Sequence, residues 1–231
     1  MTLKNEAAFF AVIVVFSLAV SVLAFTVSSS NPWNLAVRLF ALNGYIALSV
    51  AAIMTAFLKE ITLFLKKPFT RVHHYFAAAG LVLITLHPVT LAIQNLNPAV
   101  FLPNVESLYS FLFFGGRQAL IIIFIAFAAV LVRKKMVAYW RYFHALMYVA
   151  LFFGIVHADL SGRDLLNNPV IFVAFNALFG AVLVAFGLKR LQLYRLKTKR
   201  KQPLPEVGEP TKNVAWGRPL KADPLMCSRK F

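Results

Sequence analysis

Stretches of about twenty apolar residues recur along this chain and constrain its fold more than any other feature. A helix needs roughly 20 mostly apolar residues to cross the hydrocarbon core of a bilayer. Six such runs are present: Ala7–Ser28, Leu35–Leu58, His73–Leu96, Arg117–Val132, Ala138–Leu160 and Asn168–Gly187. Because 60% of the 231 residues are hydrophobic and only 14% are charged, an ordinary soluble domain is excluded. We expect an all-α integral membrane bundle of six transmembrane helices.

The first run follows Lys4 and could be taken for the apolar core of a secretory signal peptide. It is longer than a typical signal core, and no convincing small-x-small cleavage site follows it. We interpret it as a retained helix in an N-terminal segment over residues 1–34. The helical core then spans residues 35–190.

The net charge of +16 indicates orientation, because the basic residues cluster in alternate connections. Those between the second and third runs are Lys59, Lys66, Lys67 and Arg71, those between the fourth and fifth are Arg133, Lys134, Lys135 and Arg141, and twelve more follow the sixth. The opposite connections hold Arg117 and Arg163 beside the acids Glu106, Asp159 and Asp164. The positive-inside rule places both termini and the two basic connections in the cytoplasm. We expect the chain in the cell membrane, inner or plasma. A nucleic-acid partner is not expected.

Beyond about Lys189 the chain becomes basic and contains proline. This composition predicts a disordered cytoplasmic tail over residues 191–231, anchored next to the membrane. The single cysteine, Cys227, lies in this tail without a second cysteine to pair with, so no disulfide framework or CxxC site is expected.

All five histidines lie in or at the ends of the third and fifth expected helices: His73, His74, His87, His144 and His157. Ionisable groups at membrane depth are costly and usually face the bundle interior, so each is a candidate functional residue. A structural hydrogen bond is the alternative for any one of them. Five histidines on two helices favour a shared function.

The histidine spacings place pairs of imidazoles at two depths. His73 and His87 are 14 residues apart, which is about 21 Å along a helix axis and about 40° around it. His144 and His157 are 13 residues apart, or about 20 Å. If both helices run outward from the cytoplasm, His73 is level with His144 and His87 with His157. One imidazole from each of two facing helices can hold haem iron between them.

The spacing of 13 raises a geometric difficulty, because it turns the second histidine about 140° from the first in a straight helix. We expect tilt, supercoiling or a bulge near Gly154 to correct it, and Pro88 to bend the other helix just after His87. His74 lies about 100° around the helix from His73, so only one of them can face the partner helix. We expect His73, which shares a face with His87.

Two segments resemble the ferric reductase-like transmembrane domain shared by NADPH oxidases, ferric reductases and the haem subunit of the methionine sulfoxide reductase system. RVHHYFAAAGLVLITLH, Arg71 to His87, resembles the third-helix pattern of that family, and YWRYFHALMYVALFFGIVH, Tyr139 to His157, resembles its fifth-helix pattern. In the second segment Trp140 lies four residues before the first histidine. The resemblance covers roughly residues 35–190.

The resemblance implies two stacked b haems, an inner one on His73 and His144 and an outer one on His87 and His157, with electrons passing outward. In the methionine sulfoxide reductase branch the position matching His73 is typically not histidine. The histidine found here favours two bis-histidine sites, and a single haem remains the alternative.

The oxidases of this family carry a cytoplasmic flavin and nicotinamide domain after the sixth helix, and this chain has no Gly-rich dinucleotide fingerprint. We expect an electron-carrying oxidoreductase subunit that takes electrons from a separate flavoprotein reductase or a quinol. Its acceptor, which could be an extracytoplasmic protein, is left open, as is any enzyme activity of its own. The connection Asn95–Gly116 could cover the outer haem or meet that partner.

Several other polar residues have two interpretations. Arg71 and Arg141 near the inner histidines, and Arg117 on the outer side, could pair with haem propionates or extend to lipid headgroups. Arg38 could compensate a buried charge or mark the end of its helix. Asn43 and Gly44 are expected at a close helix contact.

A membrane transporter or channel is the rival function, with the histidines binding a metal ion or relaying protons. It would be expected to carry acidic residues at mid-membrane and broken helices. The acid nearest to the histidines, Asp159, lies at a helix end, which favours electron transfer.

Overall fold

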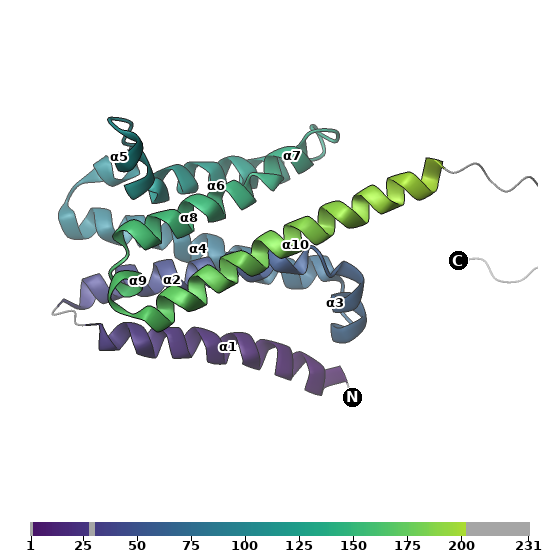
Figure 1. Cartoon of the computed structure of the whole chain (residues 1–231), viewed down its shortest axis with the longest axis horizontal. Coiled ribbons are helices and arrows are strands. Elements are labelled where there is room, and N and C mark those ends of the chain that lie inside the picture. The colour runs from purple at the N-terminus through teal and green to yellow at the C-terminus, as the bar shows by residue number, and fades with distance from the viewer. Residues whose placement is uncertain (1, 28–30, 202–231) are drawn as a thin grey trace, which may run out of the picture. The chain divides into compact units, whose positions relative to one another are not determined.

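A computed structural model describes residues 2–27 and 31–201, and all the regular secondary structure within these ranges is helical (Figure 1). This confirms the expected all-α class. The helices are α1 (Thr2–Thr26), α2 (Pro32–Met54), α3 (Leu58–Leu65), α4 (Phe69–Asn95), the 3-10 turn η1 (Pro98–Phe101), α5 (Leu108–Phe113), α6 (Gly115–Leu131), α7 (Trp140–Ala145), α8 (Met147–Ser161), α9 (Arg163–Asn167) and α10 (Pro169–Lys201).

Five helical stretches in the described residues are long and apolar enough to cross a membrane: Asn5–Thr26, Pro32–Met54, Phe69–Asn95, Trp140–Ser161 and Pro169–Leu196. They indicate a multi-pass membrane protein. The other expected span is α6, an apolar helix of 17 residues. At 1.5 Å per residue it is about 26 Å long, a little shorter than the roughly 30 Å hydrocarbon core.

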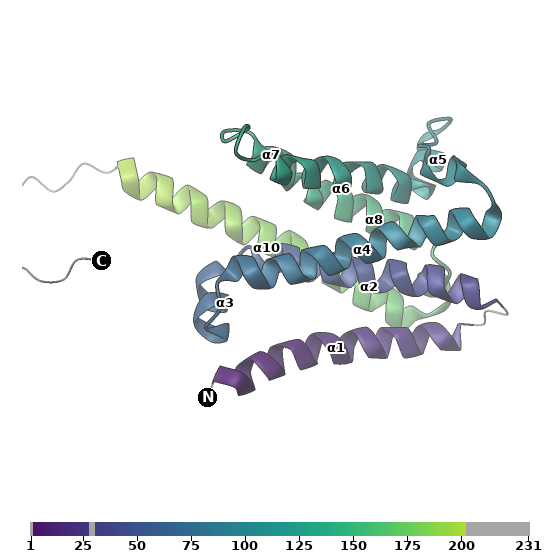
Figure 2. The same ribbon diagram turned by 180° about the vertical axis from the view of Figure 1, so that it is seen from behind.

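The basic connections lie at one end of the bundle. The views from both sides place α3 and α7 at the same end and α5 at the other (Figures 1 and 2). Lys67, just after α3, forms a 2.7 Å ion pair with Glu6 of α1. The alternation of basic and nearly neutral connections expected from the sequence is therefore also an alternation between the two ends of the bundle.

Two glycines bring α2 and α4 into close contact. A Cβ added at Gly44 would lie 2.8 Å from Ile84 Cγ1, and one added at Gly80 would lie 2.7 Å from Leu48 Cγ. Each helix thus offers a glycine to a large aliphatic side chain of the other, which allows the backbones to approach closely. The close contact expected at Gly44 is confirmed.

The fifth expected span is broken, but the break is not at Gly154. It lies at Leu146, between α7 and α8, where the Leu146 N–H bonds back to the Phe143 carbonyl at 3.1 Å. This tighter turn falls two residues after His144. It interrupts the regular α-helical hydrogen bonding between His144 and His157, the segment where the spacing of 13 calls for a departure from a straight helix. Gly154 instead lies against the Tyr45 ring of α2.

The tail expected from residue 191 is helical for longer than the sequence analysis predicted. α10 continues to Lys201, because Leu, Gln, Lys and Arg are good helix formers and no proline occurs before Pro203. The main compact unit of the chain ends at Gln192, and α10 from Leu193 onward belongs to a separate unit. Cys227 and the rest of the tail lie outside the described residues.

Candidate functional site

His73 and His144 lie side by side near the start of α4, and His87 and His157 lie toward its other end. His73 lies in the second turn of α4 because this helix begins at Phe69, four residues earlier than expected. Its ring centroid is 6.3 Å from that of His144 on α7, and the two ring planes are 80° apart. All four rings of the pairs are half-buried. At the other end, His87 of α4 lies within electrostatic range of His157 of α8.

The separation of His73 and His144 suits two ligands of one metal ion. Two imidazoles that bind an ion from opposite sides, each at about 2 Å from metal to nitrogen, have ring centroids about 6 Å apart. The centroid separation of the two rings is thus compatible with both binding one ion. His74, by contrast, is exposed and its ring is tilted beside His73 at 6.0 Å.

Three of the histidines present the same nitrogen to a backbone carbonyl of a neighbouring element. The Nδ1 of His73 lies 3.1 Å from Ala51 O, that of His87 lies 2.9 Å from Val37 O, and that of His157 lies 2.6 Å from Phe113 O. A carbonyl oxygen only accepts hydrogen bonds, so each Nδ1 carries the hydrogen. Each neutral ring therefore keeps a bare Nε2, the tautomer found in histidines that bind metals.

These carbonyls come from α2 and from the end of α5. Ala51 and Val37 belong to α2, which packs along α4 through Gly44 and Gly80, and Phe113 is the last residue of α5. The close α2–α4 contact thus places both α2 carbonyls within reach of the α4 histidines. The orientation of the imidazoles depends on this helix packing.

His144 differs from the other three. Its Nδ1 is buried and makes no hydrogen bond of normal geometry among the described residues, although the backbone of Ala126 on α6 lies close enough to interact with the ring. The Trp140 ring lies 6.3 Å from it. Buried polar atoms without a well-formed bond are uncommon and call for an explanation. His144 is therefore the least constrained of the four rings by hydrogen bonds among the described residues.

Gly116 leaves space beside the ring of His157. A Cβ at this position would lie 2.8 Å from His157 Cδ2 and 3.1 Å from Nε2. A side chain at this position would press on the Cδ2–Nε2 edge of the ring unless the ring or the helix moved. The Gly115–Gly116 pair at the start of α6 is therefore explained by the approach of α8, a role that the sequence analysis did not foresee.

The three arginines that could pair with haem propionates differ in their surroundings. Arg117 is half-buried, donates to Leu102 O at 2.7 Å and lies 4.4 Å over the Phe114 ring. Arg71 and Arg141 are exposed, and the guanidinium of Arg141 lies 5.6 Å from the Trp140 ring. Arg117 is thus fixed near the His87 end of the bundle, whereas the other two are free to extend away from the helices.

Arg38 is not a marker of the outer end of α2. It is buried and forms an ion pair with Asp164 of α9, so its role as a compensating charge is the correct alternative. Ser161 is a polar residue near the histidines that was not predicted from the sequence. Its hydroxyl lies 3.1 Å from Nδ1 of His157. Its spacing of four from this histidine was the available signal.

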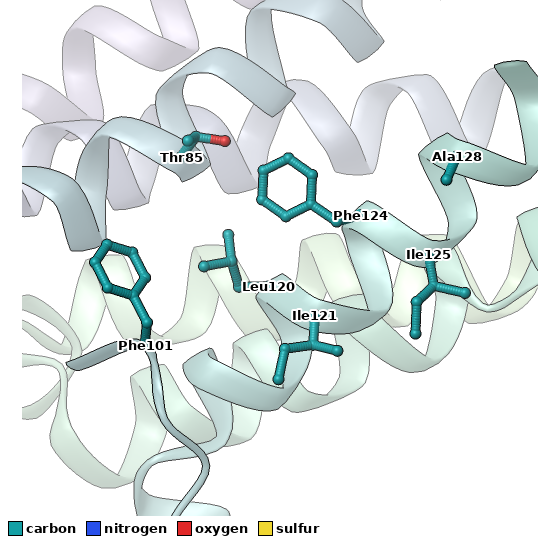
Figure 3. Close-up of a pocket in the computed structure, with 7 residues that line it drawn as sticks. All are labelled: Thr85, Phe101, Leu120, Ile121, Phe124, Ile125 and Ala128. Carbon is teal, nitrogen blue, oxygen red and sulfur yellow. The ribbon is translucent and has the colours of Figure 1, made fainter. Parts of the chain in front are cut away.

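An apolar cavity of about 630 Å³ lies between α4 and α6 (Figure 3). It is lined by Thr85, Phe101, Leu120, Ile121, Phe124, Ile125 and Ala128. Thr85 lies about 160° around α4 from His87, and Ile121, Phe124 and Ile125 are exposed side chains. The cavity therefore opens on the side of the bundle. It lies on a different face of α4 from the histidines.

Haem and a bare metal ion differ in the number of protein ligands that they need. Among the described residues, no group of three or more His, Cys, Asp or Glu side chains is placed to hold a metal ion. A bare zinc site normally takes three or four protein ligands. Haem iron needs only axial ligands from the protein, because the porphyrin supplies the others.

Comparison of the chain with family models, curated proteins and solved structures found no match.

Proposed function

We propose that this chain is a b-type cytochrome subunit that carries electrons across the membrane through bis-histidine haem, as its resemblance to the ferric reductase-like domain implies. The observation that supports this most is the common arrangement of His73, His87 and His157. Each has its Nδ1 hydrogen on a backbone carbonyl and a bare Nε2. His73 also has His144 at the separation expected for two ligands of one iron.

In this proposal six helices cross the bilayer, with α6 as the shortest, and both termini are cytoplasmic. The basic connections at the α3 and α7 end support that orientation. His73 and His144 then hold the inner haem, and His87 and His157 the outer haem. His73 is the ligand, because it faces α2 and His144 while His74 is exposed.

Haem supplies reversible one-electron chemistry when it is bound. The protein fixes the ring orientation of His73, His87 and His157 through backbone carbonyls. The apolar surfaces of α2, α4, α6 and α8 would keep water away from the haem. Gly116 keeps the space beside Nε2 of His157 free. Arg117, near His157, can neutralise a propionate on the outer side.

The electron donor would be a separate flavoprotein or a quinol that approaches the α3 and α7 end. Arg133, Lys134, Lys135 and Arg141 are exposed there, beside the inner histidine pair. A cationic surface accelerates the approach of an acidic partner more than it strengthens the final complex. An acceptor on the other side would approach the segment between α4 and α6.

The decisive experiment is a reduced-minus-oxidised visible spectrum of the purified chain, with haem quantified per polypeptide. Two haems per chain are expected. Alanine at His87 or His157 should remove the outer haem, and alanine at His73 or His144 the inner one. Loss that does not follow these pairs would refute the assignment. A colourless protein from haem-replete cells that binds zinc or conducts protons would support the transporter function instead.

A further inference from the structure

Ser161, the last residue of α8, contacts His157 twice. Its hydroxyl donates to the His157 carbonyl at 2.8 Å and lies 3.1 Å from the His157 Nδ1. The same Nδ1 lies 2.6 Å from Phe113 O. His157 is thus in contact with two oxygens at one ring nitrogen, whereas the bonds described for His73 and His87 each go to a single carbonyl.

The direction of each hydrogen bond follows from chemistry. Phe113 O can only accept, so the hydrogen is on Nδ1 of His157. The single hydroxyl hydrogen of Ser161 is used by the His157 carbonyl, which lies one helical turn back. The lone pairs of Ser161 Oγ are then free to share the Nδ1 hydrogen with Phe113.

We propose that Ser161 is a positioning residue for His157 and that, by sharing this hydrogen, it increases the electron donation from Nε2. The inference rests on the proposed haem function. Acceptors on the distal nitrogen of a ligating imidazole fix its orientation and raise its basicity. A more basic ligand favours oxidised iron, so Ser161 lowers the midpoint potential of the outer haem.

The test compares Ser161→Ala with Ser161→Thr by redox titration of the two haems. Alanine should raise one of the two midpoint potentials and leave the other in place, and threonine, which keeps the hydroxyl, should restore the original value. Ser21→Ala is the matched control. Ser21 makes the same bond to the carbonyl four residues earlier, at 2.8 Å, and its hydroxyl also accepts from Asn43 of α2, away from the histidines.

Two results would overturn the inference: both potentials unchanged in Ser161→Ala, or no recovery in Ser161→Thr. If alanine instead abolishes the outer haem and threonine retains it, the positioning role is supported. A ¹⁵N-histidine NMR spectrum of the chain prepared without haem gives an independent measurement. The Nδ1 signal of His157 should move in Ser161→Ala and remain in place in Ser21→Ala.

The two proposals fail in different ways. A wild-type protein without haem rejects the cytochrome, while the NMR measurement still tests the contact between Ser161 and His157. If the wild-type protein holds two haems and their midpoint potentials do not change in Ser161→Ala, only the inference about Ser161 is rejected.

Discussion

Arg38 of α2 and Asp164 of α9 form a buried ion pair, although they are 126 positions apart in the sequence. The guanidinium also donates to Ala24 O at 2.6 Å and Val27 O at 3.1 Å at the end of α1. One side chain thus connects three helices. It is adjacent to Val37, whose carbonyl holds His87, and its partner follows Ser161 by three positions.

Replacing Arg38 alone should therefore be more damaging than removing the pair. Arg38→Met leaves the Asp164 carboxylate buried without a cation, and we expect a loss of about 3–5 kcal/mol in the free energy of unfolding. The double variant Arg38→Met/Asp164→Leu should recover much of that loss. Denaturation of the detergent-solubilised protein measures both. A double variant no more stable than the single one would contradict the electrostatic explanation.

Gly116→Ala should disturb His157 specifically. The new methyl group would lie 2.8 Å from Cδ2 of a ring that cannot turn freely, because its Nδ1 is held by Phe113 O. We expect overpacking to cost about 1–3 kcal/mol and the outer haem content to fall. Gly180→Ala is the control, because a Cβ there meets nothing within 4 Å in the described residues. Normal haem content in Gly116→Ala would show that the space beside Nε2 is not required.

Gly80→Ala should separate α2 from α4. Its Cβ would meet not only the Leu48 side chain but also the Leu48 backbone nitrogen, at 3.0 Å, which cannot move aside by a rotamer change. We expect a lower unfolding temperature and, since the carbonyls of α2 orient both α4 histidines, a broader spectrum from both haems. Gly187→Ala on α10, where no described atom lies within 4 Å of an added Cβ, should match the wild type.

His74→Ala should leave both haems in place. The ring of His74 is exposed, whereas His73 lies beside His144 and binds Ala51 O. Haem quantification of His74→Ala against His73→Ala distinguishes the two neighbours. Selective loss of the inner haem in His74→Ala would reverse the assignment.

Neutralising Arg133, Lys134 and Lys135 together should slow reduction by an acidic donor protein at low salt, because electrostatic steering increases the association rate. The difference from the wild type should shrink as the ionic strength rises. Stopped-flow reduction at two salt concentrations measures this, with haem content as the control. Unchanged rates and unchanged topology would exclude this surface as the docking site.

Most of the helical architecture could be predicted from the sequence, because long apolar runs have one solution in a bilayer. The same apolar runs also predicted which helices carry the histidines. The boundaries were predicted less accurately. α1 begins at Thr2, α2 ends at Met54, α4 begins at Phe69 and α10 continues to Lys201, because hydropathy alone does not register where a helix begins or ends.

The supporting contacts could not be predicted in the same way. Arg38 and Asp164 are brought together only by the fold, and the carbonyls that bind the histidines leave no trace in the side-chain sequence, because every residue has one. Gly116 was visible as a glycine, but the ring it accommodates belongs to α8, 41 positions later. Periodicity describes one helix at a time, whereas these contacts belong to pairs of helices.

The interruption at Leu146 bears on why the two histidine spacings differ. Unbroken α4 carries its imidazoles 14 residues apart, close to a whole number of turns, while the segment interrupted at Leu146 carries them 13 apart. The shorter interval thus coincides with a local tightening of the helix, where the Leu146 N–H bonds to the carbonyl three residues back. On an uninterrupted helix a 13-residue interval would leave the two imidazoles about 140° apart, so removing the turn at Leu146 would move His144 around the helix axis relative to His157.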